Sequence, residues 1–249
     1  MGCISLSRYK LILQYDGSAF FGWQLQAKER TIQGEIEKAL QKISRSKVRI
    51  PIHGAGRTDT GVHAFRQTAH VDLDTNLCEN ELKNAINGNL PPDCRLGDIE
   101  KVHKNFHARF DAKMRHYRYQ CYTGESILYE NQTWIVPYLD IRRLNKLAYK
   151  IIGNHDFLSF SKHGANLKHT NCIINKSEWM SDGKMLIFSI VGNRFLHHMV
   201  RYLVGTMVAV VEERFLEKDF LALLKNPQKN VQILKAPAKG LILEKVEYD

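Results

Sequence analysis

Apolar residues recur at helical spacing in two stretches of the first hundred residues. Ile32, Ile36, Leu40 and Ile43 fall on one face of a helix, and the hydroxyl of the preceding Thr31 suits the N-cap. A second helical pattern covers residues 79–87 and should end at Gly88, ahead of two prolines. Alternation of apolar and polar residues predicts strands in the same half of the chain. We expect these strands over 9–14, 48–52, 65–73 and 99–103.

The second half shows a similar mixture of patterns. Strict alternation over 117–122 predicts a strand, and residues 141–152 place Leu144, Leu147, Ala148 and Ile151 on one side of a helix. Residues 177–190 resemble a hairpin with its turn at 181–183, because the turn contains Asp-Gly. A strongly apolar helix is expected over 194–211, and a final strand over 241–248.

Strands and helices therefore alternate irregularly along the chain and do not follow a strict βαβ order. This irregular order favours an α+β fold with a mainly antiparallel, mixed sheet. A chain of 249 residues can fold as one large domain or two modest ones. Because the two halves carry comparable elements, we expect an N-terminal α+β domain over 1–105 and a C-terminal α+β domain over 106–249.

The loop between two expected strands, Gly54 to Ala64, concentrates the chemistry of the chain. Its sequence, GAGRTDTGVHA, places Arg57 two residues before Asp59 among three glycines. Glycines allow positive φ and close approach of the backbone to another molecule, so such a loop can present a side chain outward. A nearby cation suits a carboxylate that has to stay ionised. The alternative is an ordinary turn in which Asp59 bonds its own backbone.

Six segments in the same order as in a known family widen this interpretation. The loop with the following FRQTAHVD closely resembles the signature of the TruA family of tRNA pseudouridine synthases. Five further segments also resemble it: YDGSAFFGWQ (15–24), INGNLP (86–91), FHARFDAKMRHYRY (106–119), FLHHMVRYLVG (195–205) and APAKGLIL (236–243). One such segment is weak evidence, but six in order, spanning nearly the whole chain, are strong evidence.

The resemblance implies an isomerase that converts uridine to pseudouridine in tRNA, at positions 38 to 40 of the anticodon arm. It implies two pseudo-symmetric RNP-like domains with a basic cleft between them, a homodimer, and a cytoplasmic location. The reaction is a net isomerisation, so we expect no cofactor and no metal. It needs a carboxylate that acts as a nucleophile or stabilises a developing cation, and the family match assigns this role to Asp59.

Four further residues receive roles from the same resemblance. Arg57 is expected to handle the target base, and Arg201 is expected to be the basic partner that keeps Asp59 ionised. Tyr117 matches the residue that stacks on the target base, and Leu243 matches an apolar position of the uracil pocket. Each has a plainer alternative: a solvated basic helix face for Arg201, a half-buried sheet position for Tyr117, and the hydrophobic core for Leu243.

The helical spacing over 194–211 adds a geometric expectation for Arg201. If this stretch is one helix, then Arg194, His197 and Arg201 share a face. Tyr119, two residues from Tyr117 on the same strand face, is expected to fill the sheet.

The charge of the chain agrees with a polyanionic partner. Lys and Arg number 36 against 26 acidic residues, which gives a formal net charge of +10 and a pI near 9.3. The tracts 42–49 and 162–169 are expected to follow RNA phosphates, or to be ordinary charged loops. Five scattered cysteines without a CxxC pair indicate reduced thiols and no zinc site. No apolar run is long enough to span a membrane.

Two positions depart from the family pattern. Cys172 stands where the family often has an arginine, and Ile242 stands where an aromatic residue is usual. Two other functions remain open beside the synthase. One is a catalytically silent tRNA-binding module of the same fold, which a degenerate loop would favour. The other is a glycoside hydrolase, which would need a second acidic residue within the loop.

Overall fold

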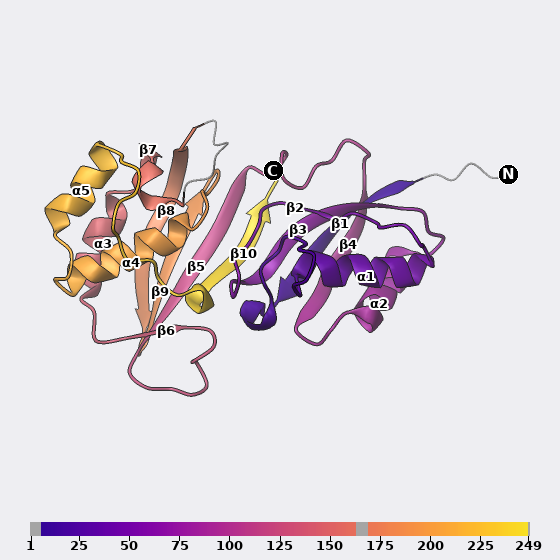
Figure 1. Cartoon of the computed structure of the whole chain (residues 1–249), viewed down its shortest axis with the longest axis horizontal. Coiled ribbons are helices and arrows are strands. Elements are labelled where there is room, and N and C mark those ends of the chain that lie inside the picture. The colour runs from indigo at the N-terminus through magenta and orange to yellow at the C-terminus, as the bar shows by residue number, and fades with distance from the viewer. Residues whose placement is uncertain (1–5, 163–168, 249) are drawn as a thin grey trace. The chain divides into compact units, whose positions relative to one another are not determined.

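The computed structural model describes residues 6–162 and 169–248 and confirms the α+β prediction (Figure 1). Five α-helices occur in this part of the chain, together with a mixed and mainly antiparallel set of strands. The chain divides into two compact units, Met1–Lys113 with Leu243–Asp249, and Met114–Ile242. No helix within the described residues has the length and apolar character needed to cross a membrane.

The first unit is built on three antiparallel strands in the order β4-β1-β3. They are β1 (Ser7–Tyr15), β3 (His63–Leu73) and β4 (Cys94–Val102), and the short β2 (His53–Gly54) pairs with β3. In β1 every second residue is buried, so one face of the strand lies in the core. The two helices of the unit, α1 (Ile32–Ser44) and α2 (Glu79–Asn89), lie side by side, and α2 packs on β4 (Figure 1).

Helix α1 forms as its sequence predicts. The Thr31 hydroxyl accepts the N–H of Gly34 at 3.2 Å, and Ile32, Ile36 and Leu40 are buried. The helix ends where Arg45 adopts the left-handed conformation, with φ of 50°. Helix α2 runs to Asn89, so the predicted end at Gly88 is wrong. Gly88 stays helical, and the helix ends at Asn89. Leu90 is extended because the ring of Pro91 disfavours helical geometry in the residue before it.

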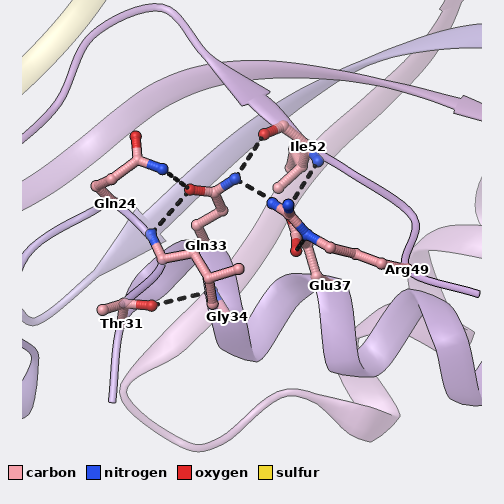
Figure 2. Close-up of polar contacts among 8 residues, drawn as sticks. Gln24, Thr31, Gln33, Gly34, Glu37, Arg49 and Ile52 are labelled. Atoms are coloured by element: carbon pink, nitrogen blue, oxygen red, sulfur yellow. Dashed lines mark hydrogen bonds and ion pairs between the residues drawn. The ribbon is translucent and has the colours of Figure 1, made fainter. Parts of the chain in front are cut away.

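The strand expected over 48–52 is also wrong, because a polar network with α1 holds this segment (Figure 2). The buried carboxylate of Glu37 accepts two bonds from the Arg49 guanidinium, at 2.6 and 2.9 Å, and one from the N–H of Ile52 at 3.1 Å. The Gln33 amide donates to Glu37 at 2.9 Å and to the Ile52 carbonyl at 3.2 Å. Side chains of α1 therefore satisfy main-chain groups that a strand would have given to a neighbouring strand.

The second unit contains strands in the order β5-β9-β8-β7. They are β5 (Met114–Thr123), β9 (Met185–Gly192), β8 (Asn171–Asp182) and β7 (Gly153–Asp156), all antiparallel to their neighbours. The short β6 (Trp134–Val136) pairs in parallel with β5 and makes the strand set mixed. Helix α3 (Ile141–Tyr149) packs against β8 and also contacts α4 (Met199–Val211), which contacts α5 (Glu217–Lys225) (Figure 1).

The predicted hairpin is present, with its turn at Gly183 and Lys184, since Asp182 pairs with Met185 and Gly183 has φ of 57°. The last strand, β10 (Leu241–Glu247), follows β3 in the strand order, and the division between the two units falls inside it. Three short 3₁₀ turns complete the described elements: η1 (Gly17–Ala19), η2 (Leu158–Phe160) and η3 (Ala238–Gly240).

Candidate functional site

Asp59 lies on the connection between β2 and β3, where its side chain is partly buried. A main-chain bond closes the turn that follows, with the Asp59 carbonyl accepting the N–H of Val62 at 3.1 Å. Arg57 is exposed on the same loop. A main-chain bond thus closes the turn, and one short segment carries both the carboxylate and the guanidinium.

The segment between β1 and α1 holds this loop from the other side. The N–H of Trp23 donates to the Thr58 carbonyl at 3.0 Å, and the Tyr15 hydroxyl lies 2.9 Å from the Thr58 Oγ1. On the far side of Asp59, the N–H of Gly17 donates to Nδ1 of His63 at 3.1 Å. These contacts fix the backbone both before and after Asp59.

Two glycines allow the segments to approach this closely. A Cβ on Gly17 would lie 2.1 Å from the carbonyl oxygen of Val62, and a Cβ on Gly22 would lie 2.7 Å from that of Thr58. Gly22 also has φ of 81°, which side-chain-bearing residues rarely adopt. Sequence reasoning recognised YDGSAFFGWQ as a family segment but gave it no role. Its glycines were the available signal that another backbone lies against it.

An ion pair stabilises the same segment from outside. The Arg30 guanidinium donates to both carboxylate oxygens of Asp93 at 2.7 Å and lies 4.0 Å from the centre of the Phe20 ring. The hydrogen-bonded pair raises the pKa of Arg30 and lowers the pKa of Asp93. The arginine therefore packs on the buried ring of Phe20, two residues before Gly22.

Tyr117 and Tyr119 of β5 have different environments. Tyr117 is partly exposed, and its ring meets that of Phe195 edge-on, with centroids 5.1 Å apart and planes at 82°. Tyr119 is fully buried and donates its hydroxyl to the Pro237 carbonyl at 2.8 Å, and burial raises the pKa of this phenol. Tyr119 therefore fills the core as expected, while the ring of Tyr117 remains partly accessible.

Arg201 lies in the first turn of α4 and is 9% exposed. Its Nε donates to the Ala236 carbonyl at 2.9 Å, and the Ala236 N–H donates back to the Arg201 carbonyl at 3.0 Å. Gly205 allows this strand-like contact, since a Cβ there would lie 2.2 Å from the Leu234 carbonyl oxygen. A solvated basic face is thus excluded for Arg201, because the side chain is buried.

The helix itself is shorter than the sequence predicts. It begins at Met199, because His198 adopts the left-handed conformation with φ of 62° and interrupts helical geometry. Arg194 and His197 precede the helix, so the expected helical face shared by Arg194, His197 and Arg201 is wrong. Arg194 instead contacts the imidazole of His169 at 3.1 Å.

The remaining predicted positions are buried. Leu243 and Ile242 lie in β10, and Cys172 lies in β8. Burial raises the pKa of the Cys172 thiol to about 11, so this cysteine stays protonated at neutral pH. The four cysteines among the described residues are free thiols.

The two basic tracts differ in what can be said of them. In the tract 42–49, Arg49 is bound to Glu37, whereas Lys42 and Lys47 are exposed. Most of the tract 162–169, including Lys168, lies outside the described residues. Among the predicted site residues, Asp59 and Arg57 share one loop of the first unit, and Tyr117 and Arg201 belong to the second.

The first unit therefore contains a half-buried carboxylate on a rigid loop beside an exposed guanidinium. Such a group can act as a nucleophile or stabilise a developing positive charge, because it can be held at a fixed position with respect to a bound substrate.

Comparisons with known proteins identify the family to which the sequence is similar. A family model described as tRNA pseudouridine synthase matches residues 11–111 and 147–249. Two curated proteins named tRNA pseudouridine synthase A, from Bacillus licheniformis and Borreliella afzelii, are 38% and 39% identical to the chain over 245 and 246 residues. These alignments cover 97% and 95% of this chain, and 99% and 97% of the relatives.

A third relative of the same name, from Pseudothermotoga lettingae, is 37% identical and covers 98% of this chain and its own full length. Among solved structures, a Cbf5-Nop10-Gar1 complex covers 92% of this chain and 56% of that chain, at 9% identity. Its TM-score is 0.36, so this similarity adds nothing to the family assignment.

Proposed function

The chain belongs to the tRNA pseudouridine synthase family, and from this premise we propose that it isomerises uridine to pseudouridine in tRNA. The observation that carries the proposal is the Asp59 loop, which matches the family signature and is held in place on both sides by hydrogen bonds. A catalytically silent tRNA-binding module would have no need for this rigid placement of a carboxylate.

The proposed reaction breaks the bond between N1 of uracil and C1′ of ribose and forms a bond between C5 and C1′. The proton on C5 leaves and N1 gains a proton, so atoms and electrons balance without an oxidant or reductant. We assign Asp59 as the catalytic carboxylate. It acts in its ionised form, either as the nucleophile or as the group that stabilises charge developing on the ribose or the base.

The other predicted residues take supporting roles in the proposal. Arg201, buried and anchored to the Ala236 carbonyl, keeps Asp59 ionised, and Arg57 contacts the nucleotide that leaves the helical stack. Tyr117 offers a partly accessible ring for the extruded uracil, and Leu243 contributes to the apolar wall of the pocket. Because Leu243 is buried, a role in the hydrophobic core also accounts for it.

The substrate class follows from the same premise. We propose uridines at positions 38, 39 and 40 in the anticodon stem-loop, with the protein acting as a cytoplasmic homodimer and without a cofactor. The net charge of +10 supports a polyanionic substrate, since phosphate contacts dominate affinity for nucleic acids.

The central assignment is tested by Asp59→Asn, which removes the charge at nearly constant volume. Pseudouridine formation on unmodified tRNA transcripts should be lost, whereas the melting temperature and the Kd for tRNA should change little. Mass spectrometry of the variant excludes deamidation back to aspartate. Substantial turnover by verified asparagine protein would remove Asp59 from the chemistry, and an inactive wild-type enzyme that binds tRNA would support the silent module.

A further inference from the structure

The connection after β4 exposes a large aromatic side chain in the first unit. Phe110 is 76% exposed, although it follows an ordered turn that begins at Phe106. The ring is supported from one side, because the His107 imidazole lies 4.2 Å away, centroid to centroid, with an angle of 34° between the planes. An exposed phenylalanine supported in this way presents one open face of its ring.

Several hydrogen bonds make the turn rigid. The Asp111 carboxylate accepts the His107 N–H at 2.7 Å, and the Asp111 N–H donates to the His107 carbonyl at 3.1 Å. Nδ1 of His107 accepts the N–H groups of Arg109 and Phe110 at 3.1 and 3.3 Å. The turn therefore fixes both the ring of Phe110 and the imidazole beneath it.

The turn is also attached to the core of the unit. Nδ1 of the buried His70 accepts the Ala108 N–H at 3.1 Å, and the Ala108 carbonyl accepts the Tyr248 hydroxyl at 2.7 Å. The His70 ring lies 4.6 Å from that of His107. Phe110 thus forms the outer end of a column of rings that starts at His70 on β3.

The column is uncharged near neutral pH. Burial and the neighbouring His107 lower the pKa of His70 to about 4, and burial also lowers the pKa of His107. Three cationic residues, Lys104, Arg109 and Lys113, are exposed on the same connection, and the Arg109 guanidinium is 5.9 Å from the Phe110 ring centre. The single carboxylate of this turn, that of Asp111, accepts a hydrogen bond from the main-chain N–H of His107.

An exposed aromatic ring with a guanidinium nearby fits an unpaired nucleotide, whose base stacks and whose phosphate is anionic. We propose that Phe110 is a stacking platform for an unpaired base of the RNA substrate, with Arg109 contacting an adjoining phosphate. This inference rests on the proposed function, because the RNA is taken to be the tRNA that the enzyme modifies. A protein partner fits less well, since the exposed residues on either side of Phe110 in the chain, Arg109 and Asp111, are both charged.

The test compares Phe110→Ala, Phe110→Leu and Phe110→Trp in the full-length protein. Leucine retains apolar area without a flat π-face, whereas tryptophan retains stacking. Tyr149→Ala is the matched control, since Tyr149 is a 71% exposed aromatic residue on α3. Probes are an unmodified tRNA transcript, a single-stranded RNA and a duplex RNA with the same number of phosphates.

The alanine and leucine variants should raise the Kd for tRNA and for the single strand roughly 5-fold or more, because this is the loss of affinity expected when one base no longer stacks on an aromatic ring. The tryptophan variant should bind within about 2-fold of wild type, and the single strand should quench its fluorescence more than that of wild type. Duplex affinity and the melting temperatures should stay unchanged. In pseudouridine assays, KM should rise with kcat preserved.

Wild-type affinity of both the alanine and the leucine variants would overturn the platform. So would an equal loss of single-strand and duplex binding, which indicates a charge or folding effect, or rescue by leucine, which indicates apolar docking. A change in sedimentation mass with unchanged RNA binding would assign the ring to contacts between protein chains. A failure of the proposed function can be distinguished from a failure of this inference. In the first case the wild-type protein makes no pseudouridine but its RNA binding still depends on Phe110.

Discussion

The contact between Tyr15 and Thr58 provides a sharp test of how the Asp59 loop is positioned. Tyr15 is 3% exposed at the end of β1, and its hydroxyl lies 2.9 Å from that of Thr58, which is 7% exposed. Tyr15→Phe removes one oxygen and keeps the ring that packs beside Trp23. Because the buried Thr58 hydroxyl loses this partner, the free energy of unfolding should fall by about 1–3 kcal/mol.

The same change should slow catalysis more than it weakens binding. Thr58 adjoins Asp59, and a displacement of about 1 Å at a catalytic group can cost on the order of 100-fold in rate. We expect kcat for pseudouridine formation to fall roughly 10- to 100-fold, with KM for tRNA nearly unchanged. Single-turnover assays at saturating tRNA measure the first quantity, and urea denaturation measures the stability.

Two further variants separate positioning from general damage. Tyr9→Phe removes a hydroxyl from a buried tyrosine on the same strand but at its other end, so kcat should stay at the wild-type value. Combining Tyr15→Phe with Thr58→Val removes both hydroxyls, and its stability loss should be smaller than the sum of the two single losses by about 0.5–3 kcal/mol. Strict additivity, or wild-type kcat in Tyr15→Phe, would refute the reasoning.

Two other predictions follow from the same structure. The pKa of His70 is about 4 in the folded protein against about 6.5 in the unfolded chain. Its contribution to the free energy of unfolding is therefore complete above pH 6.5 and is lost, by up to about 3 kcal/mol, as the pH falls from 6.5 to 4. Urea denaturation across this window should show that the stability of His70→Asn depends less on pH than that of wild type, and parallel curves would contradict the assignment. Arg201→Met should lower kcat at saturating tRNA. Lys42→Ala changes an exposed residue and should instead raise KM in a salt-dependent way while kcat stays the same. If Arg201→Met changes only KM, then Arg201 is a phosphate contact.

The elements that the sequence predicts well are those that local forces specify. Helix α1 follows from its apolar spacing and from Thr31. Helix α3 buries Leu144, Leu147 and Ala148 as its periodicity predicts, but it ends at Tyr149 and not at 152, so the buried Ile151 lies beyond the helix. The failures arise from partners distant in the chain or from single backbone angles. Residues 48–52 alternate like a strand, but Glu37 and Gln33 of α1 bind them, and periodicity carries no information about that network. The helix expected from residue 194 begins only at Met199, because His198 adopts a left-handed conformation although it is not a glycine.

The candidate site was predictable to a similar degree. Clustered glycines and the family signature indicate Asp59 and Arg57 as candidate site residues, because both signals are local. The hydrogen bonds that hold the loop join residues more than 40 positions apart, such as Tyr15 with Thr58 and Gly17 with His63. Sequence spacing could not predict these pairs. The burial of Arg201 likewise depends on Ala236, 35 residues later.

The way this loop is held explains how a glycine-rich segment can place a carboxylate with accuracy. Loops rich in glycine are ordinarily mobile, since each glycine adds conformational freedom to the backbone. Here two glycines outside the loop allow another segment to pack closely against it, which restricts the loop backbone. Gly22 allows contact with Thr58 on one side of Asp59, and Gly17 allows contact with Val62 on the other. To displace Asp59, the loop has to break the bond from Trp23 or the bond to Gly17, and each of these backbone groups would then lie buried without a partner. The backbone contacts therefore fix the main chain that carries Asp59, and the direction of its carboxylate then depends on the rotamer of this one side chain.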